Sequence, residues 1–340
     1  MTPRIPVPAR TATTILAAGT LLAGCGATVE DAAPSNGSGP ATTVTNCGAP
    51  LTVPHTPARA VVNDTGIAEI MFALGLTDRI AGYTTYDGKH VDYRTSPWKA
   101  DFDRAPNLGT GFTRETIQSA RPDFVFAGWS YGFQETSGVT PDWVREIGAV
   151  PYQLTEACRQ PGTTARGIMP PLDALFADLT NLGTIFGVPD RAAKLVADYR
   201  ARIDAVRAQA PREGRARVFL FDSASPDPFT SGRTGTPQAI IESAGGTNVF
   251  GDLDNSWTTA SWEAAAQRDP EVIVIVDYGV GPENTPDAKI AQLKSQPLMA
   301  NTTAVREGNY VVLPYAALVE GPRTPGSVET LGAYLRSKGR

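Results

Sequence analysis

The pattern of apolar and polar positions divides most of the chain into short strands that alternate with helices. Runs of four or five apolar residues predict buried strands, and longer stretches with apolar residues three and four positions apart predict helices. The clearest early helix is predicted at 65–74, where the apolar residues share one face and Gly75 marks the end. The other elements predicted in this half are strands at 61–62, 80–83 and 123–127 and helices at 113–120 and 141–148.

The pattern changes near residue 170. Apolar residues at helical spacing predict two long amphipathic helices, at 170–186 and 190–209. Strands and helices then alternate again, with a helix predicted at 236–244 that ends at the Gly245-Gly246 pair. Strands predicted at 218–221, 272–276 and 310–313 would form a second small sheet of parallel type.

This order of elements predicts an α/β protein of two small lobes that flank one long helix. We expect the first lobe at 51–168, the interdomain helix at 169–187 and the second lobe at 188–340. A chain of about 300 residues beyond the N-terminal segment is long enough for two lobes that each bury a core.

The N-terminus has the pattern of a bacterial export signal. Arg4 and Arg10 precede an apolar run at 11–22, and the sequence LAGC ends at Cys25 in the form of a lipobox. This resemblance predicts a signal peptide at 1–24, lipidation of Cys25 and a Gly/Pro/Ser-rich flexible tether within 25–50. The protein would then be exported and lipid-anchored to the outer face of the cytoplasmic membrane. A plain signal peptide and a membrane helix are the alternatives, and the apolar run is short for a span.

Charge and cysteine content narrow the functional classes. The net charge is −5 and basic runs are absent from the sequence, which argues against nucleic acid as a partner. If Cys25 carries lipid, Cys47 and Cys158 remain, and export favours a disulfide between them. Two buried thiols are the alternative.

The stretch 217–263 combines the features of a ligand cleft. Two polar loops carry Phe229 and Trp257, one on each side of the helix at 236–244, and Arg233 lies between them. Aromatic rings with an arginine suit a planar or bulky, partly anionic ligand.

Several motifs in this order resemble the substrate-binding proteins of ABC importers for ferric siderophores, vitamin B12 and haem, in the class whose two lobes are joined by a single rigid helix. The motifs are ARAVVNDTGIAEIMFALGLTDRIAGYT, RETIQSARPDFVFAG, DPFTSGRTGTPQAIIESAGGTNVFGD and Trp257 with Ser261-Trp262-Glu263 before EVIVIVD. The resemblance covers roughly 51–335. It implies an α/β fold of two small lobes joined by one long, rigid interdomain helix, with a ligand cleft between the lobes. It also implies a monomeric protein that binds a small molecule, takes no cofactor of its own and docks on a permease dimer with its ATPase.

The resemblance also implies roles for individual residues. Glu115 and Glu263 match the two surface glutamates that dock on permease arginines in this family; the alternative is an ordinary glutamate favoured at a helix N-terminus. Positions where the family contacts its ligand, often with aromatic residues, match Trp129, Phe229 and Trp257, and Tyr83 and Tyr86 lie in a loop that often adds another. Arg233, and more weakly Arg323 and Arg94, are the candidate anion-binding residues, with Arg94 expected on the surface. The alternative for the rings is core packing, which we expect for Phe124, Phe126 and Phe250.

Two other functions need to be weighed. Residues 128–132 spell GWSYG, the G-x-S-x-G pattern that would make Ser130 the nucleophile of a serine hydrolase. That fold needs a histidine downstream of the serine, whereas His55 and His90 both lie upstream. A carrier of bare metal ions would need several converging histidines and carboxylates, so we expect no metal site, although His90 or a tyrosine could ligate haem iron.

The sequence therefore predicts a non-enzymatic binding protein that captures a ferric siderophore-type chelate. Cobalamin, haem or an anionic flavin-like cofactor precursor remain alternatives.

Overall fold

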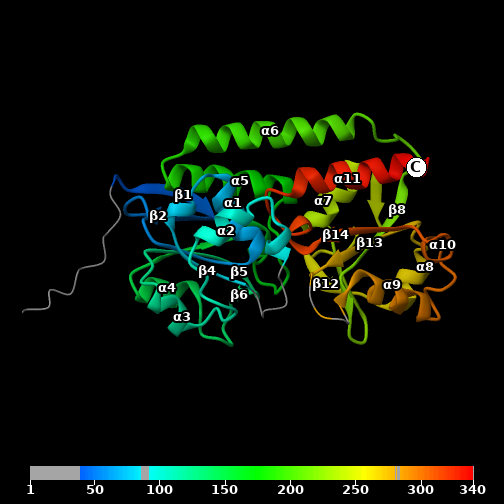
Figure 1. Cartoon of the computed structure of the whole chain (residues 1–340), viewed down its shortest axis with the longest axis horizontal. Helices are drawn as coiled ribbons and strands as arrows, with labels where there is room; N and C mark the ends of the chain where they lie inside the picture. The colour runs from blue at the N-terminus through cyan, green and yellow to red at the C-terminus, as the bar shows by residue number, and fades with distance from the viewer. Residues whose placement is uncertain (1–38, 86–91, 280, 282–283, 340) are drawn as a thin grey trace, which may run out of the picture. The chain divides into compact units, whose positions relative to one another are not determined.

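The computed structural model describes residues 39–85, 92–279, 281 and 284–339. Within them it is a mixed α/β structure of two lobes with eleven α-helices and two mainly parallel sheets (Figure 1). The signal peptide predicted at 1–24 and the lipidation site Cys25 lie outside the described residues, as do Tyr86 and His90. None of the helices in the described ranges combines the length and apolar character needed to cross a bilayer.

The first lobe contains a parallel sheet in which β3 (Ala60–Asn63) pairs with β4 (Ile80–Thr84) and β5 (Phe124–Trp129). On its other side, β5 pairs with β7 (Val150–Gln153) and, at its end, with β6 (Gly132–Phe133). The lobe also contains α1 (Thr65–Ala73), α2 (Lys99–Arg104), α3 (Arg114–Ser119) and α4 (Pro141–Glu146). The predicted strands and helices of this lobe are confirmed, with small shifts at their ends.

The second lobe is built on a parallel sheet in the order β11-β8-β13-β14. Its strands are β8 (Ala216–Phe221), β11 (Gly246–Asn248), β13 (Val272–Asp277) and β14 (Tyr310–Pro314). Alternate residues of these strands belong to different apolar clusters: Leu220 and Val274 pack with one, Phe219 and Ile273 with the other. Both faces of the sheet are therefore covered, which explains the continuous apolar runs in the sequence.

Helices cover the sheet of the second lobe. They are α7 (Thr236–Ala244), α8 (Trp262–Gln267), α9 (Pro286–Ser295), α10 (Thr303–Glu307) and α11 (Thr324–Ser337). Helix α7 ends where Gly245 adopts φ 99°, a left-handed conformation that favours glycine, so the predicted stop is confirmed. Phe124, Phe126 and Phe250 are buried in the apolar clusters, as expected.

Two antiparallel helices connect the lobes, α5 (Pro171–Ile185) and α6 (Pro189–Arg207), and lie side by side in Figure 1. Helix α5 contacts β1 (Thr42–Asn46) in the first lobe and α7 in the second, whereas α6 packs on α5, α7 and α11. One apolar cluster runs without a break from Phe126 of the first lobe through Leu179 and Ile203 to Leu220 of the second. A shared core of this kind resists large hinge motions between the lobes.

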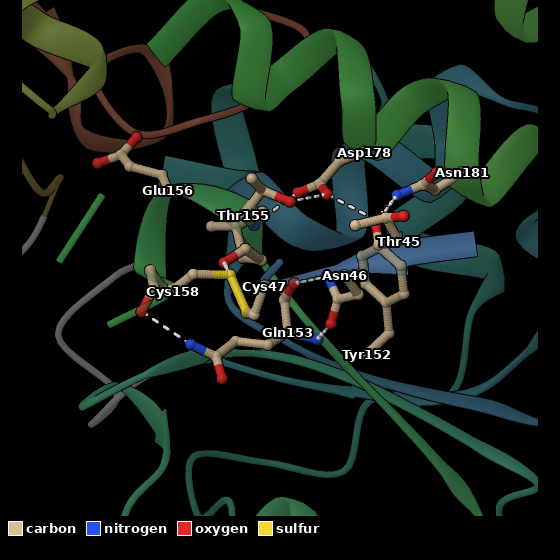
Figure 2. The surroundings of a disulfide bond; sticks show 12 residues. Thr45, Asn46, Cys47, Tyr152, Gln153, Thr155, Glu156, Cys158, Asp178 and Asn181 are labelled. Atoms are coloured by element: carbon tan, nitrogen blue, oxygen red, sulfur yellow. Dashed lines mark hydrogen bonds between the residues drawn. A yellow bond between two sulfur atoms is a disulfide. The ribbon is translucent and has the colours of Figure 1, made fainter. Parts of the chain in front are cut away.

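The region assigned to the tether contains regular structure. Residues 42–53 form an antiparallel hairpin of β1 and β2 (Ala49–Val53). Asn46 exchanges hydrogen bonds with the backbone of Gln153, at 2.7 and 3.0 Å, and the Asn181 amide donates to the Thr45 carbonyl at 2.8 Å (Figure 2). The ordered structure of the first lobe thus begins before residue 51, and the polar composition of 42–46 reflects an edge hairpin rather than a flexible segment.

A disulfide joins Cys47, in the turn of this hairpin, to Cys158, with Cα atoms 5.3 Å apart (Figure 2). The expected pairing of these two cysteines is confirmed. Cys158 directly follows η4 (Thr155–Ala157), a short 3-10 helix, so the disulfide fixes the end of that helix to the hairpin.

The two lobes repeat one local arrangement. Arg59 donates to the carbonyls of Ala120 and Arg121, and Arg217 of the second lobe donates to those of Arg268 and Asp269. In both lobes the residues that accept these hydrogen bonds lie between a short capped helix and a central strand of the sheet. The helices α3 and α8 therefore occupy equivalent places in the two lobes.

Candidate ligand-binding cleft

A cavity of about 240 Å³ lies between the lobes. Residues from both lobes line it: Ser130, Tyr131, Glu156 and Arg166 from the first, and Asp222, Phe229, Trp257, Tyr278, Tyr315 and Val319 from the second. Five of the ten lining side chains are aromatic. Such a mixture of apolar rings and a few polar groups is typical of small-molecule sites.

The cavity lies where parallel strands end. Tyr131 comes shortly after β5, Asp222 directly after β8, Tyr278 directly after β13 and Tyr315 directly after β14. Open α/β sheets bind ligands outside the carboxyl ends of their strands, because the following loops turn away there and leave a crevice. The same edge of both sheets faces this cavity.

Phe229 and Trp257 form one aromatic wall. They lie on neighbouring antiparallel strands, β10 (Pro228–Ser231) and β12 (Trp257–Thr259), and their rings stack with centroids 6.0 Å apart and planes 22° apart. The two predicted rings are therefore brought together at the cavity.

Tyr278 and Tyr315 form a second stacked pair, with ring centroids 5.3 Å apart. The Tyr278 hydroxyl donates to Asp222 Oδ2 at 2.6 Å, and the Tyr315 hydroxyl donates to Asp64 Oδ2 at 2.9 Å. Asp64 belongs to the first lobe, where it caps α1 by accepting from the Gly66 N–H. The second pair is thus held from both lobes.

Glu156 of η4 is the central polar residue of the cleft. Its Oε1 accepts from Trp257 Nε1 at 3.1 Å, and its Oε2 accepts from the N–H and hydroxyl of Thr236 at 3.2 and 2.5 Å. Burial raises the pKa of Glu156, while these donors and the nearby charge of Arg166 oppose that rise. A first-lobe carboxylate therefore fixes a cleft tryptophan and the first residue of α7, both in the second lobe.

Two buried carboxyl groups, those of Glu320 and Asp178, lie next to Glu156 and its neighbour Thr155. Glu320 Oε2 accepts from the Glu156 N–H at 2.8 Å, and Asp178 of α5 accepts from the Tyr152 hydroxyl at 2.6 Å and the Thr155 N–H at 2.8 Å (Figure 2). Burial, followed by the charge of Asp178, raises the pKa of Glu320 well above its usual range. Burial also raises the pKa of Asp178. Both shifts disfavour two negative charges at the lobe junction, because the two carboxyl groups are buried and interact with each other.

The GWSYG motif has a packing explanation. A Cβ on Gly128 would overlap the Tyr131 ring, and one on Gly132 would approach the Ala127 Cβ at 2.7 Å. Ser130 lies between them, exposed and with φ 70°. The glycines thus allow a tight turn from β5 to β6 that places Tyr131 in the cleft, and the motif does not require a nucleophile.

The structure places the other predicted residues as follows. Tyr83 is buried in the core of the first lobe, where its ring packs edge-on against Phe102, because β4 turns this position inward. Trp129 ends β5, and its side chain is outside the described part. Arg94 is exposed, as expected.

Neither predicted anion-binding arginine lines the cavity. Arg233 is exposed and pairs with Asp254, with 2.7 Å between Nη2 and Oδ2. It borders a larger surface hollow of about 720 Å³ between the 160–172 segment and helices α5, α6 and α7. That hollow is rich in exposed charges of both signs and lacks the strand ends and stacked rings of the smaller cavity.

Arg323 forms a buried ion pair with Glu69 of α1, and its Nε donates to Glu69 Oε2 at 2.7 Å. The Ser96 hydroxyl donates to the same carboxylate at 2.5 Å. Arg323 therefore ties the second lobe to the first instead of facing the cavity.

Seven lining residues were not among the sequence candidates: Tyr131, Glu156, Arg166, Asp222, Tyr278, Tyr315 and Val319. Three of them could have been found, because Asp222, Tyr278 and Tyr315 follow strands that the apolar pattern predicts. Glu156 and Arg166 lie in irregular segments and carry no comparable pattern.

Glu115 and Glu263 occupy equivalent exposed positions, each the second residue of its helix. Thr113 caps α3 by accepting from the Thr116 N–H at 3.2 Å, and Ser261 caps α8 by accepting from the Ala264 N–H at 3.1 Å. A backbone N–H, followed by the Thr113 hydroxyl, lowers the pKa of Glu115. The described residues contain no group of three or more His, Cys, Asp or Glu that could hold a metal ion.

Comparison with known proteins gives one consistent family. Residues 61–317 match the model of the family described as periplasmic binding protein. A cobalamin-binding protein of Halobacterium salinarum is 23% identical over 267 residues, covering 77% of this chain and 65% of that protein, which is just under two thirds of its length.

Two crystal structures share the fold. A periplasmic binding protein from Veillonella parvula is 27% identical with a TM-score of 0.73, covering 88% of this chain and 99% of that chain. An ABC-type Fe3+-hydroxamate transport system protein from Saccharomonospora viridis is 24% identical with a TM-score of 0.69, covering 86% and 98%. Because the family model spans most of the chain and the two-lobed fold agrees, the chain belongs to the periplasmic binding protein family, whose members are extracytoplasmic binding proteins rather than enzymes.

Proposed function

We propose that the protein captures a ferric siderophore-type chelate between its lobes and delivers it to the permease of an ABC importer. The aromatic cavity at the strand ends carries this proposal, because the rings of Phe229, Trp257, Tyr278 and Tyr315 line it together. About 240 Å³ encloses only part of a chelate of this size, so the rest would extend from the mouth of the cleft. The chelate is the cargo, and the protein takes no resident cofactor.

Cobalamin is the second candidate, because relatives named for cobalamin or vitamin B12 match up to 77% of the chain. Haem and an anionic flavin-like precursor are the other two candidate ligands for the same aromatic walls. Titration of intrinsic tryptophan fluorescence with a ferric hydroxamate, cyanocobalamin, haemin and flavin mononucleotide tests the proposal. Trp257 lines the cavity, so a true ligand should quench its emission and raise the melting temperature. No response to any of the four would refute the ligand class.

Delivery would use the two equivalent glutamates. Glu115 and Glu263 are exposed on corresponding helices of the two lobes, and charges on a rim orient a partner more than they add affinity. A monomer with one glutamate on each lobe suits a permease dimer with one arginine cluster on each subunit.

Attachment to the membrane would come from lipid on Cys25. This proposal rests on the LAGC sequence alone. Cys25→Ser should move the protein from the membrane fraction to the released fraction of cells that express it, and retention in the membrane fraction would refute lipid anchoring at this residue.

A further inference from the structure

We propose that the cleft selects against negative charge, so that the ligand portion held between the lobes is uncharged or cationic, with Asp222 and Glu156 setting this preference. The inference deepens the proposed function and rests on it. It also reverses the expectation from sequence, in which an arginine beside the aromatic rings indicated an anionic ligand.

The charged groups that line the cavity are two carboxylates and one guanidinium. Asp222 and Glu156 are both buried, and Arg166 is half-buried. Arg166 lies close enough to Glu156 to lower its pKa, so its charge already compensates one carboxylate. In the described part of the chain, Arg166 is the only cation lining this cavity.

The second carboxylate has a cationic neighbour outside the cavity. Lys289 is buried, donates to the Val276 carbonyl at 2.7 Å and lies 4.5 Å from the Tyr278 ring centroid. Burial raises the pKa of Asp222, and the charge of Lys289 opposes that rise, but Lys289 does not line the cavity. A bound anion would therefore meet Asp222 directly, with the half-buried Arg166 as the one cation in the lining within the described residues.

The causes of the pKa shift of Tyr131 indicate the sign of the electrostatic potential inside the cavity. Burial is the main cause of its raised pKa, and the charges of Glu156 and Asp64 raise that pKa further, while Arg166 lowers it. The same groups that disfavour a negative charge on the Tyr131 hydroxyl would disfavour one on a ligand beside it. Because the site is partly desolvated, these charges act more strongly than they would in water.

The aromatic rings also disfavour a bound anion. The face of an aromatic ring carries partial negative charge and attracts cations. Phe229, Trp257, Tyr278, Tyr315 and Tyr131 together supply five of the ten lining side chains. The arginines that could have offset this field, Arg233 and Arg323, pair with Asp254 and Glu69 away from the cavity.

A charge series on one chelate tests the inference. Ferrioxamine B carries a pendant ammonium group, its N-acetyl derivative is uncharged, and its N-succinyl derivative is an anion with the same iron centre. We expect affinity to fall in that order, by about threefold to tenfold at each step at low salt, with smaller steps at high salt. Two further pairs make the same comparison on the other ligand classes. Cyanocobalamin is compared with its more negative monocarboxylate, and haemin dimethyl ester is compared with the more negative haemin.

Two variants of opposite sign assign the effect to the cleft. Asp222→Asn should reduce the preference for the cationic member, and Arg166→Gln should increase it. Arg233→Gln is the matched control, because that arginine is outside the cavity, and it should leave the order unchanged. Circular dichroism and melting temperature show whether Asp222→Asn folds. If it does not fold, the affinity order measured with Arg166→Gln tests the inference by itself.

The outcomes separate the two proposals. Equal affinities within a series that binds, or tighter binding of the anionic member, would overturn the charge preference and leave the proposed function intact. Failure of every series to bind would overturn the proposed function itself.

Discussion

The indole Nε1 of Trp257 donates a hydrogen bond to Glu156 Oε1 across 3.1 Å, and this contact joins the two lobes inside the cleft. Glu156 also binds Thr236 at the start of α7, so one carboxylate fixes both an aromatic wall and a helix of the opposite lobe. Any change that moves Glu156 should therefore alter ligand binding before it unfolds the protein.

Removal of the Trp257 ring should weaken ligand binding far more than folding. Trp257→Ala loses the stack with Phe229 and the bond to Glu156, and we expect roughly 2–3 kcal/mol of lost binding free energy. Trp257→Phe keeps a ring and should lose about half as much. Both variants remove the tryptophan whose emission the fluorescence titration follows, so their affinities are measured by calorimetric titration.

Trp262→Phe is the matched control for Trp257. Its indole donates to the Pro226 carbonyl at 2.9 Å, but its ring lies in the apolar cluster on the far side of the second sheet. This variant should lower the melting temperature and leave affinity unchanged. If Trp257→Phe and Trp262→Phe change the affinity and the melting temperature in the same way, the assignment of Trp257 to the cleft is refuted.

Glu320→Gln should flatten the dependence of stability on pH. The folded pKa of Glu320 is raised above its unfolded value, so its protonated form stabilises the fold below the unfolded pKa, and this stability is lost as pH rises through the folded pKa. A glutamine keeps the carbonyl that accepts from the Glu156 N–H and has no charge to bury. We expect the variant to gain on the order of 1 kcal/mol at pH 8 and little at pH 4.

Urea unfolding at several pH values measures this effect. Glu329→Gln is the control, because Glu329 pairs with Arg202 on the surface and has a lowered pKa, so the sign of its pH effect is opposite. A Glu320→Gln variant that keeps the wild-type pH profile would contradict the raised pKa of Glu320.

Reduction of the disulfide should lower stability and also weaken ligand binding. The bond closes a sequence separation of 111 residues, for which the chain-entropy model gives about 4–5 kcal/mol. Cys158 follows the 3-10 helix that carries Glu156, so the paired Cys47→Ser/Cys158→Ser variant should also lower affinity. Melting and calorimetry of this variant, compared with the oxidised wild type, check both effects; unchanged affinity would show that Glu156 keeps its place without the bond.

Arg323→Met should destabilise the protein without changing its ligand charge preference. The substitution removes the guanidinium that pairs with the buried Glu69 carboxylate, and breaking a buried pair costs about 3–5 kcal/mol. The double variant Arg323→Met/Glu69→Met should recover much of this loss. If Arg323→Met instead altered the affinity order of the charge series, this arginine would act on the ligand.

Glu115→Ala combined with Glu263→Ala should abolish uptake and leave ligand affinity and melting temperature nearly unchanged. Both side chains are exposed, so neither contributes to the core. Transport assays in cells, beside titration of the purified protein, separate the two steps. Wild-type uptake by the double variant would end the docking proposal.

Much of the fold follows from local pattern. The continuous apolar runs that begin at Val218 and Val272 indicate a sheet covered on both faces, and such sheets are parallel and alternate with helices. The caps Thr113 and Ser261 and the stop at Gly245 act within a few residues, so the sequence identifies them directly. Phe229 and Trp257 were found because each lies in a polar stretch of sequence that an apolar core would not explain, although the structure forms short antiparallel strands there.

The sequence by itself therefore determined the two α/β lobes, the helices between them and one aromatic wall of the cleft. Only the tertiary structure decided which charges face the ligand. Arg323 pairs with Glu69 at a separation of 254 residues, and Glu156 meets Trp257 at a separation of 101. The partner of a charged side chain depends on which distant segments the fold brings within about 3 Å of it, and no local pattern encodes that distance.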